Sequence, residues 1–298
     1  MTIRIGTSER DGTFHSQGRA LKAILEPQGL GPVDVLESKS ASVDNAKRLH
    51  AGEIDFGFTA SNWIGRAKRG EAPFVAPADL RMAAPMNAGP LFFIALAGAP
   101  IRAVSDLRGK RVAVGLRTSG MVQHVHAIFG ALGLRFSDFT PVYLDFAAGA
   151  DALAAGEVDA QFQCPIPNQV MTDLAARVDV RVLAFGPGQI ETVMRAVPDY
   201  RSTVMRKHAI RGLEGDVAQI AVVNVLATHA RVPEPMVRDV TGAVITAAGE
   251  LGRINPLFAG LRDLFAPLRQ RGPSALEFGG VPLHPGALRA YREAGLVG

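Results

Sequence analysis

The chain contains one short phrase twice. Residues 51–58 read Ala-Gly-Glu-Ile-Asp-Phe-Gly-Phe, and residues 155–162 read Ala-Gly-Glu-Val-Asp-Ala-Gln-Phe. In each copy a glycine able to end a helix is followed by a run typical of a buried strand. Any helix end before a buried strand has some of this character, but here the elements before the phrase also recur in order. We therefore interpret the chain as two halves built on one plan.

The first half predicts alternating strands and helices. The expected order is a strand at 3–6, a helix at 13–25, a strand at 33–36, a helix from Ser42 to Gly52 and a strand at 54–58. Within the first helix, Ala20, Leu21 and Ile24 fall on one face, as in an amphipathic helix. Such alternation favours a parallel sheet covered by helices on both faces.

The second half repeats this order: a strand at 112–115, a loop at 116–120, helices at 122–132 and 149–155, and strands at 142–144 and from Val158. The apolar segments 91–97 and 220–226 are expected to cross between the halves. We predict an α/β fold with two lobes, residues 1–91 with 225–298 and residues 92–224. The carboxyl ends of both sheets would then face a ligand cleft between the lobes.

Composition narrows the class of protein. With 298 residues, 48% of them hydrophobic, the chain can bury a large core. Its net charge of +4 is spread over interleaved acidic and basic residues, and the basic groups at 66–69 and 108–111 lack alternating aromatics, so no nucleic-acid partner is expected. The longest apolar run, 91–97, is far shorter than the roughly 18 residues of a membrane span. We predict a protein that does not itself span a membrane.

The start of the chain and its cysteine count bear on location. Residues 1–6 read as a strand and lack the features of a secretory signal, so we expect a periplasmic protein if a leader was removed and a cytoplasmic one otherwise. Cys164 is the only cysteine, which excludes an internal disulfide and a cysteine-rich zinc site.

Several segments resemble a known family. They are residues 5–7 with 12–14, 42–45 leading to 51–58, 106–115 with 119–120, and 281–295, the last being the most specific. The chain resembles the TAXI solute-binding proteins of tripartite ATP-independent periplasmic (TRAP) transporters over nearly its whole length. This resemblance implies a type II periplasmic-binding-protein fold, a small carboxylate ligand such as an amino acid or dicarboxylate, and the membrane permease subunits of a TRAP transporter as partner.

Four expected helix starts supply the first candidate ligand-binding residues. Helix N-termini expose unpaired N–H groups and attract anions. Each of these residue types is also a common N-cap, which is the alternative for any one of them alone. The resemblance places the set together around a ligand. The residues are Thr13, Ser40, Ser42, Ser61, Asn62, Thr118, Ser119 and Gly120.

Other candidates depend on side-chain chemistry. Arg117 suits a bidentate bond to a carboxylate or a solvated loop position. Phe14 suits packing on the ligand or in the core, and Gln163 a hydrogen bond from the floor of the cleft. His15, His124 and Cys164 are expected on loops or helix starts near the cleft, where they support a second hypothesis, a cytoplasmic lyase or decarboxylase, or a ligand sensor, on the same fold.

Metal and catalytic motifs are missing from the sequence. His124 and His126 are two residues apart on a helix, so their side chains diverge and do not form a metal-binding pair. Neither a nucleophile-elbow motif nor a phosphate loop occurs. The leading prediction is therefore a binding protein that is not an enzyme and needs no cofactor or metal.

Overall fold

The computed structural model describes residues 2–10, 12–117, 119–163 and 166–298. Two compact units are present. Unit 1 comprises Met1–Ala88 and Val223–Gly298, and unit 2 comprises Gly89–Val222. The chain passes from one unit to the other twice, within strand β4 (Leu80–Leu96) and within strand β10 (Val217–His229). The segments 91–97 and 220–226, expected to cross, fall largely within these two longer strands.

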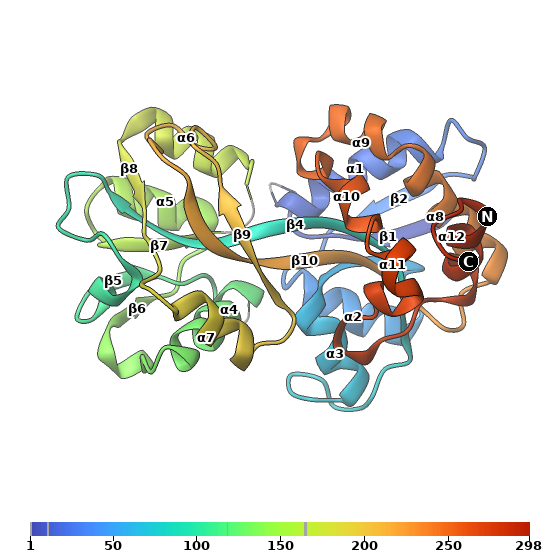
Figure 1. Ribbon diagram of the computed structural model, residues 1–298, viewed down its shortest axis with the longest axis horizontal. Helices are drawn as coiled ribbons and strands as arrows, with labels where there is room; N and C mark the ends of the chain where they lie inside the picture. The colour runs from blue at the N-terminus through green and yellow to red at the C-terminus, as the bar shows by residue number, and fades with distance from the viewer. Residues whose placement is uncertain (1, 11, 118, 164–165) are drawn as a thin grey trace. The chain divides into compact units, whose positions relative to one another are not determined.

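Unit 1 is built on a parallel sheet. Strand β1 (Ile3–Gly6) lies between β2 (Val33–Leu36) and β3 (Phe56–Ala60) and is parallel to both, while β10 is antiparallel to β3. Helices α1 (Thr13–Leu25), α2 (Ser42–Ala51) and α3 (Ser61–Arg69) follow the three parallel strands in turn (Figure 1). The predicted order and types of these elements are confirmed.

The third strand begins two residues later than predicted, at Phe56. Asp55 precedes it and accepts hydrogen bonds from the backbone N–H of Arg4 at 2.9 Å and from the Arg4 guanidinium at 2.8 Å. The backbone N–H of Asp55 donates in turn to the carbonyl of Arg4 at 3.0 Å, and the register of β3 with β1 begins with Phe56 opposite Ile5.

The C-terminal part of the chain completes unit 1 with further helices: α8 (Glu234–Thr246), α9 (Ala248–Ile254), α10 (Leu261–Phe265), α11 (Leu268–Arg271) and α12 (Pro285–Glu293). Helix α12 packs closely on α8, and the hydroxyl of Tyr291 donates to the carbonyl of Ala83 at 2.9 Å. Tyr291 is fully buried, and this raises the pKa of its phenol.

Unit 2 repeats the parallel arrangement. Strand β5 (Arg111–Ala113) lies between β7 (Ala160–Gln163) and β6 (Thr140–Val142) and is parallel to both. Strands β7 and β8 (Val180–Val182) pair antiparallel with β4, and β9 (Tyr200–Met205) pairs antiparallel with β10. The helices are α4 (Gly120–Ala131), α5 (Phe146–Ala154), α6 (Gln169–Arg177) and α7 (Gln189–Ala196). Most element types predicted here are confirmed, with bounds displaced by one to three residues.

The repeated phrase has the same structure in both units. Gly52 and Gly156 both adopt a left-handed backbone, with φ of 79° and 73°. Asp159 accepts from the backbone N–H of Arg111 at 2.7 Å and from its guanidinium at 2.8 Å, as Asp55 does from Arg4. In each unit, therefore, one arginine–aspartate pair joins the turn between a helix and the following strand to the neighbouring parallel strand. The turn precedes β3 in unit 1 and β7 in unit 2.

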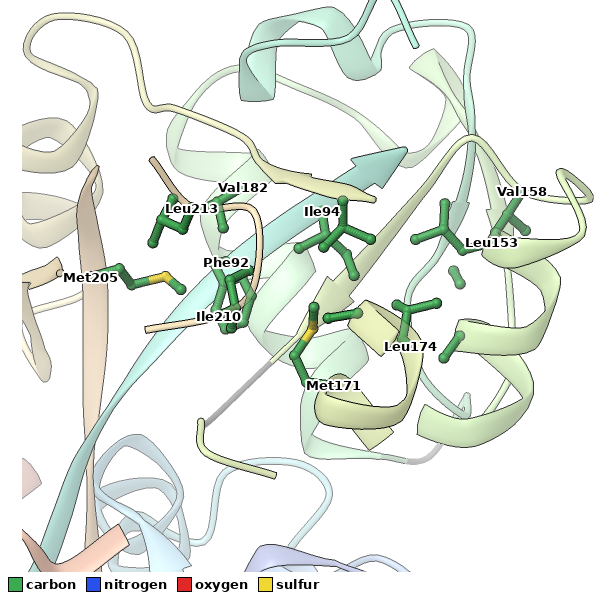
Figure 2. Packing of buried hydrophobic residues seen from close by; sticks show 14 of the residues in the cluster. Phe92, Ile94, Leu153, Val158, Met171, Leu174, Val182, Met205, Ile210 and Leu213 are labelled. Carbon is green, nitrogen blue, oxygen red and sulfur yellow. The ribbon is translucent and has the colours of Figure 1, made fainter. Parts of the chain in front are cut away.

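The apolar core of unit 2 lies against β4. Figure 2 shows Phe92 and Ile94 of this strand packed with Leu153 of α5 and Leu174 of α6. All four side chains are fully buried. Burial of one such side chain contributes about 1.5–3 kcal/mol, so this cluster holds the two helices on the sheet.

Across the described residues, none of the helices combines the length and the apolar character that a bilayer crossing requires.

Candidate functional site

The parallel strands of unit 1 end at one edge that carries polar side chains. We call this the polar edge of unit 1 and define it by Thr7, Ser38, Ser42, Asn45 and Ser61. The Ser38 hydroxyl donates to the Thr7 carbonyl at 2.8 Å, and the Asn45 amide donates to the carbonyls of Thr7 and Phe58 at 2.7 and 2.8 Å. These buried bonds fix the ends of β1 and β3 relative to α2.

Helices α1, α2 and α3 begin at this edge after N-cap residues whose side chains form no cap. These N-cap residues are Gly12, Ala41 and Ala60, and no side chain at these positions accepts a helix N–H. In α1, the Ser8 hydroxyl oxygen accepts from the backbone N–H of His15 at 3.2 Å instead. Thr13, Ser42 and Ser61 are the first helical residues instead of the caps. Their backbone N–H groups have no hydrogen-bond partner among the residues described. Uncapped N–H groups and positive dipole ends attract an anion.

Ser42 and Ser61 differ in their hydrogen bonds. The Ser42 hydroxyl oxygen accepts from the backbone N–H of Ala60 at 3.0 Å, so it joins the start of α2 to the start of α3. The Ser61 side chain is 0% exposed, and its hydroxyl lacks a partner within the described part of the chain. A buried unpaired hydroxyl lowers the stability of the folded protein by about 1–3 kcal/mol, and a ligand that forms a hydrogen bond with it would remove this penalty. The Asn62 carboxamide oxygen is likewise buried and unpaired there.

The remaining candidates of unit 1 are tied into the protein. The N–H of Ser40 donates to the Asp44 carboxylate at 2.8 Å. Phe14 is 7% exposed and stacks on Phe58 with ring centroids 5.4 Å apart, which fits the core role that the sequence left open. His15 lies half-buried near Thr7.

The His15 imidazole is in hydrogen-bond contact with Thr7. The Thr7 hydroxyl donates to the carbonyl of Leu36 at 3.0 Å, and its oxygen lies 3.3 Å from His15 Nδ1. The same hydroxyl lies 3.3 Å from the carbonyl of Ser8, so Thr7 joins the loop after β1 to the start of α1 and the end of β2.

Helices α4, α5 and α6 of unit 2 begin with a side-chain cap, whereas α7 begins after Gly188 and has none. Ser119 accepts from the N–H of Val122 at 3.5 Å, Asp145 from Ala148 at 2.7 Å and Asn168 from Met171 at 2.8 Å. Ser119 therefore occupies the capping position that was its alternative, and Gly120 is the first residue of α4. Of the four helix starts that the sequence singled out, the three at the polar edge of unit 1 have N-cap residues without a capping side chain.

Arg117 of unit 2 is exposed, and its guanidinium lies 3.8 Å from the ring centroid of Tyr143. This contact holds the arginine over an aromatic face, a place where its planar charge is favoured. Sequence reasoning missed Tyr143, because nothing local to residue 143 marks it as a partner of residue 117. Two candidates, Thr118 and Cys164, lie outside the described residues.

His124 is buried inside α4. It is 5% exposed, and its Nδ1 lies 2.5 Å from the hydroxyl oxygen of Tyr200. Burial lowers the pKa of His124 to about 4, so the ring is neutral near pH 7. His124 is the fifth residue of α4, close to the helix start where it was expected, and its side chain points into the core. His126 stacks instead on Phe136, with ring centroids 3.5 Å apart.

Gln163 ends β7 and is 0% exposed. Its amide nitrogen donates to Gln161 Oε1 at 3.0 Å. Histidine, cysteine and acidic side chains form no group of three that could hold a metal within the described ranges.

Comparison with solved structures places this fold among binding proteins. The chain is similar to a structure described as a periplasmic transporter, with 12% identity, a TM-score of 0.56, and coverage of 88% of this chain and 95% of that one. It is also similar to an ancestral arginine-binding protein bound to arginine, with 16% identity, a TM-score of 0.51, and coverage of 87% and 97%. A third match is a putative periplasmic sulfonate-binding protein SsuA from Methylobacillus flagellatus KT, with 16% identity, a TM-score of 0.51, and coverage of 100% and 96%.

At these identities the likeness establishes the fold, which is the predicted type II periplasmic-binding-protein fold. The family that matches is described as NMT1-like, in place of the narrower TAXI group suggested by the sequence segments. Because that match extends over residues 5–295, the chain belongs to the NMT1-like family.

Proposed function

We propose that this protein is a solute-binding protein that captures a small organic anion, in the first place a carboxylate, at the polar edge of unit 1. The observation that carries the proposal is the Ser61 hydroxyl, buried and unpaired among the described residues, at the starts of α2 and α3, whose N-cap residues carry no capping side chain. Backbone N–H groups and a hydroxyl are donors that suit a carboxylate or sulfonate oxygen.

Delivery to a membrane transporter is the second part of the proposal. The fold, the family match and the names of similar structures support a periplasmic component of a transport system. The resemblance of residues 281–295 to TAXI proteins favours permease subunits of a TRAP transporter as the partner. Copurification of the chain with each candidate permease, in the presence of ligand, distinguishes a TRAP transporter from an ATP-driven one.

The burial of His124 argues against the lyase alternative. His124 is bonded to Tyr200 and neutral near pH 7, so it is poorly placed to supply acid–base catalysis. We therefore propose that bound acid leaves the protein unchanged. Mass spectrometry of acids recovered from the complex tests this, and loss of the acid with appearance of a product would favour an enzyme.

A thermal-shift panel tests the proposed function directly. The panel contains amino acids, keto acids, dicarboxylates, aromatic acids and sulfonates, each added to the full chain. A ligand at a hundred times its Kd is expected to add roughly 2.7 kcal/mol of stability. Stabilisation by none of these anions would contradict the proposal.

Two serine variants then locate the bound anion. Ser61→Ala is expected to weaken binding of the best ligand about tenfold, since one hydrogen bond to a charged group is worth about 1.5–3 kcal/mol. Ser274→Ala is the matched control, because Ser274 is an exposed serine of the same unit whose hydroxyl donates to the Arg271 carbonyl. Equal weakening by both variants would remove Ser61 from the site.

A further inference from the structure

Two buried glutamines of unit 2 form a directed chain of hydrogen bonds. Gln161 and Gln163 are two residues apart on β7, so their side chains lie on one face of the sheet. Gln161 Nε2 donates to the backbone carbonyl of Phe146 at 2.9 Å. A carbonyl only accepts, which fixes the orientation of the Gln161 amide and leaves its Oε1 to accept from Gln163 Nε2.

The end of this chain is an acceptor without a donor. Gln163 Oε1 is buried and has no partner among the described residues. The Gln163 amide is prevented from reversing, because reversal would place its oxygen against Gln161 Oε1. An unpaired buried carbonyl is costly to the fold, so a group that donates to it would be bound preferentially.

The chain is also built into its surroundings. Gly149 of α5 lies so close that a Cβ at this position would be 2.6 Å from Gln161 Nε2. Glycine there leaves room for the Gln161 side chain to reach Phe146 at the start of α5. Gln163 is the last residue of β7, and β7 is parallel to β5 and in turn to β6, so its amide lies at the edge where these strands end.

We propose that Gln163 is a specificity-determining residue of unit 2, whose Oε1 accepts a hydrogen bond from a bound organic acid. The preferred solute is then an acid that also carries a hydroxyl or ammonium donor, rather than an acid with a plain hydrocarbon skeleton. This inference rests on the proposed function, since it assumes that an organic acid is the ligand. Gln161 acts through Gln163 and is a positioning residue.

Pairs of acids that differ by one donor test the inference. Malate carries one hydroxyl group that succinate lacks, and glutamate carries one ammonium group that glutarate lacks. Calorimetry gives the ratio of the two Kd values within each pair. For the wild-type chain, the donor-bearing member of at least one pair is expected to bind about tenfold more tightly. In Gln163→Met, which has similar volume and no amide, this ratio is expected to fall towards one.

Two further variants separate specificity from folding. Gln161→Met frees the Gln163 amide to reverse, so the ratio is expected to shrink without disappearing. Gln169→Met changes an exposed glutamine of α6 and is expected to keep the wild-type ratio. Because the readout is a ratio between two ligands, a uniform loss of stability in any variant does not change it.

The outcomes distinguish this inference from the function on which it rests. If no acid of these pairs and no anion of the thermal-shift panel binds, the proposed function fails. If acids bind but the wild type does not favour the donor-bearing member, or Gln163→Met keeps the preference, only the role of Gln163 is overturned.

Discussion

Two serines at neighbouring helix starts of unit 1 are expected to respond oppositely to removal of their hydroxyl groups. Ser42→Ala leaves the buried N–H of Ala60 without its acceptor and should lower the free energy of unfolding by about 1 kcal/mol. Ser61→Ala removes an unpaired buried hydroxyl, so the ligand-free protein should be equally stable or more stable. Urea denaturation measures both. A larger loss for Ser61→Ala would show that its hydroxyl supports the ligand-free fold.

His124 makes stability depend on pH. Its pKa is about 4 in the folded protein and 6.5 when unperturbed, so above pH 6.5 neither state takes up a proton. As pH falls from 6.5 to 4, only the unfolded state is protonated, and the folded state loses on the order of 3 kcal/mol. His124→Gln should remove this part of the dependence. The check is the difference in unfolding free energy between pH 7 and pH 4.5, wild type against variant, and an unchanged difference would contradict the assignment.

Local sequence predicted residue roles only where the partner is local. Asn168 caps α6 by accepting from the N–H of Met171, three residues away, and a cap of this kind depends only on local sequence. The partner of His124 is Tyr200, 76 residues further along the chain, and no local pattern carries that information. Thr7 was missed for the same reason, because its contacts to Leu36 and His15 depend on the order of the strands.

At the scale of elements, the two arginine–aspartate pairs provide a matched comparison. The Asp55 side chain is 8% exposed and that of Asp159 is 29% exposed, although their bonds to arginine have the same pattern. Arg111 lowers the pKa of Asp159 through their hydrogen bond. Asp55→Asn should lower the free energy of unfolding by about 2 kcal/mol and Asp159→Asn by about 1 kcal/mol, because solvent screens the more exposed pair. Chemical denaturation checks the order, and a reversed order would contradict this explanation.

The close packing of α12 on α8 predicts a second effect. A Cβ at Gly286 would be 2.8 Å from the backbone nitrogen of Arg238, and backbone cannot yield as a flexible side chain does. Gly286→Ala should therefore destabilise the protein by about 1–3 kcal/mol or more. Gly242→Ala, within α8 where no atom crowds the position, should stabilise it by about 0.5–1 kcal/mol. Thermal unfolding of both variants measures the contrast, and similar effects would show that α12 shifts without cost.

Element types followed from periodicity, whereas element ends often did not. The first strand and the first helix have the predicted bounds because each is closed by its own turn residues. Strand β4 begins at Leu80, eleven residues before the predicted Leu91. Pro85 and Pro90 lie inside it, and proline lacks the N–H of a regular ladder, so the pattern indicated a later start.

For the whole molecule, the duplicated phrase predicted two similar α/β halves, and the same glycine and arginine–aspartate geometry occurs in both units. The sequence could not predict that the N-cap residues of α1, α2 and α3 carry no capping side chain while Ser119 caps α4. That difference depends on which residue precedes each helix by one position, a boundary that periodicity does not resolve. Enclosure of the ligand by movement of the two lobes remains a prediction from the sequence.

An organic anion bound at the starts of α1, α2 and α3 would change the surroundings of their first backbone amides. Amide chemical shifts can be recorded by NMR while the best-stabilising acid is titrated into the full chain. The largest changes are expected at the backbone amides of Thr13, Ser42 and Ser61, and Ser61→Ala is expected to reduce them at a given ligand concentration. Saturable binding that leaves these three amides unchanged would rule out this binding site.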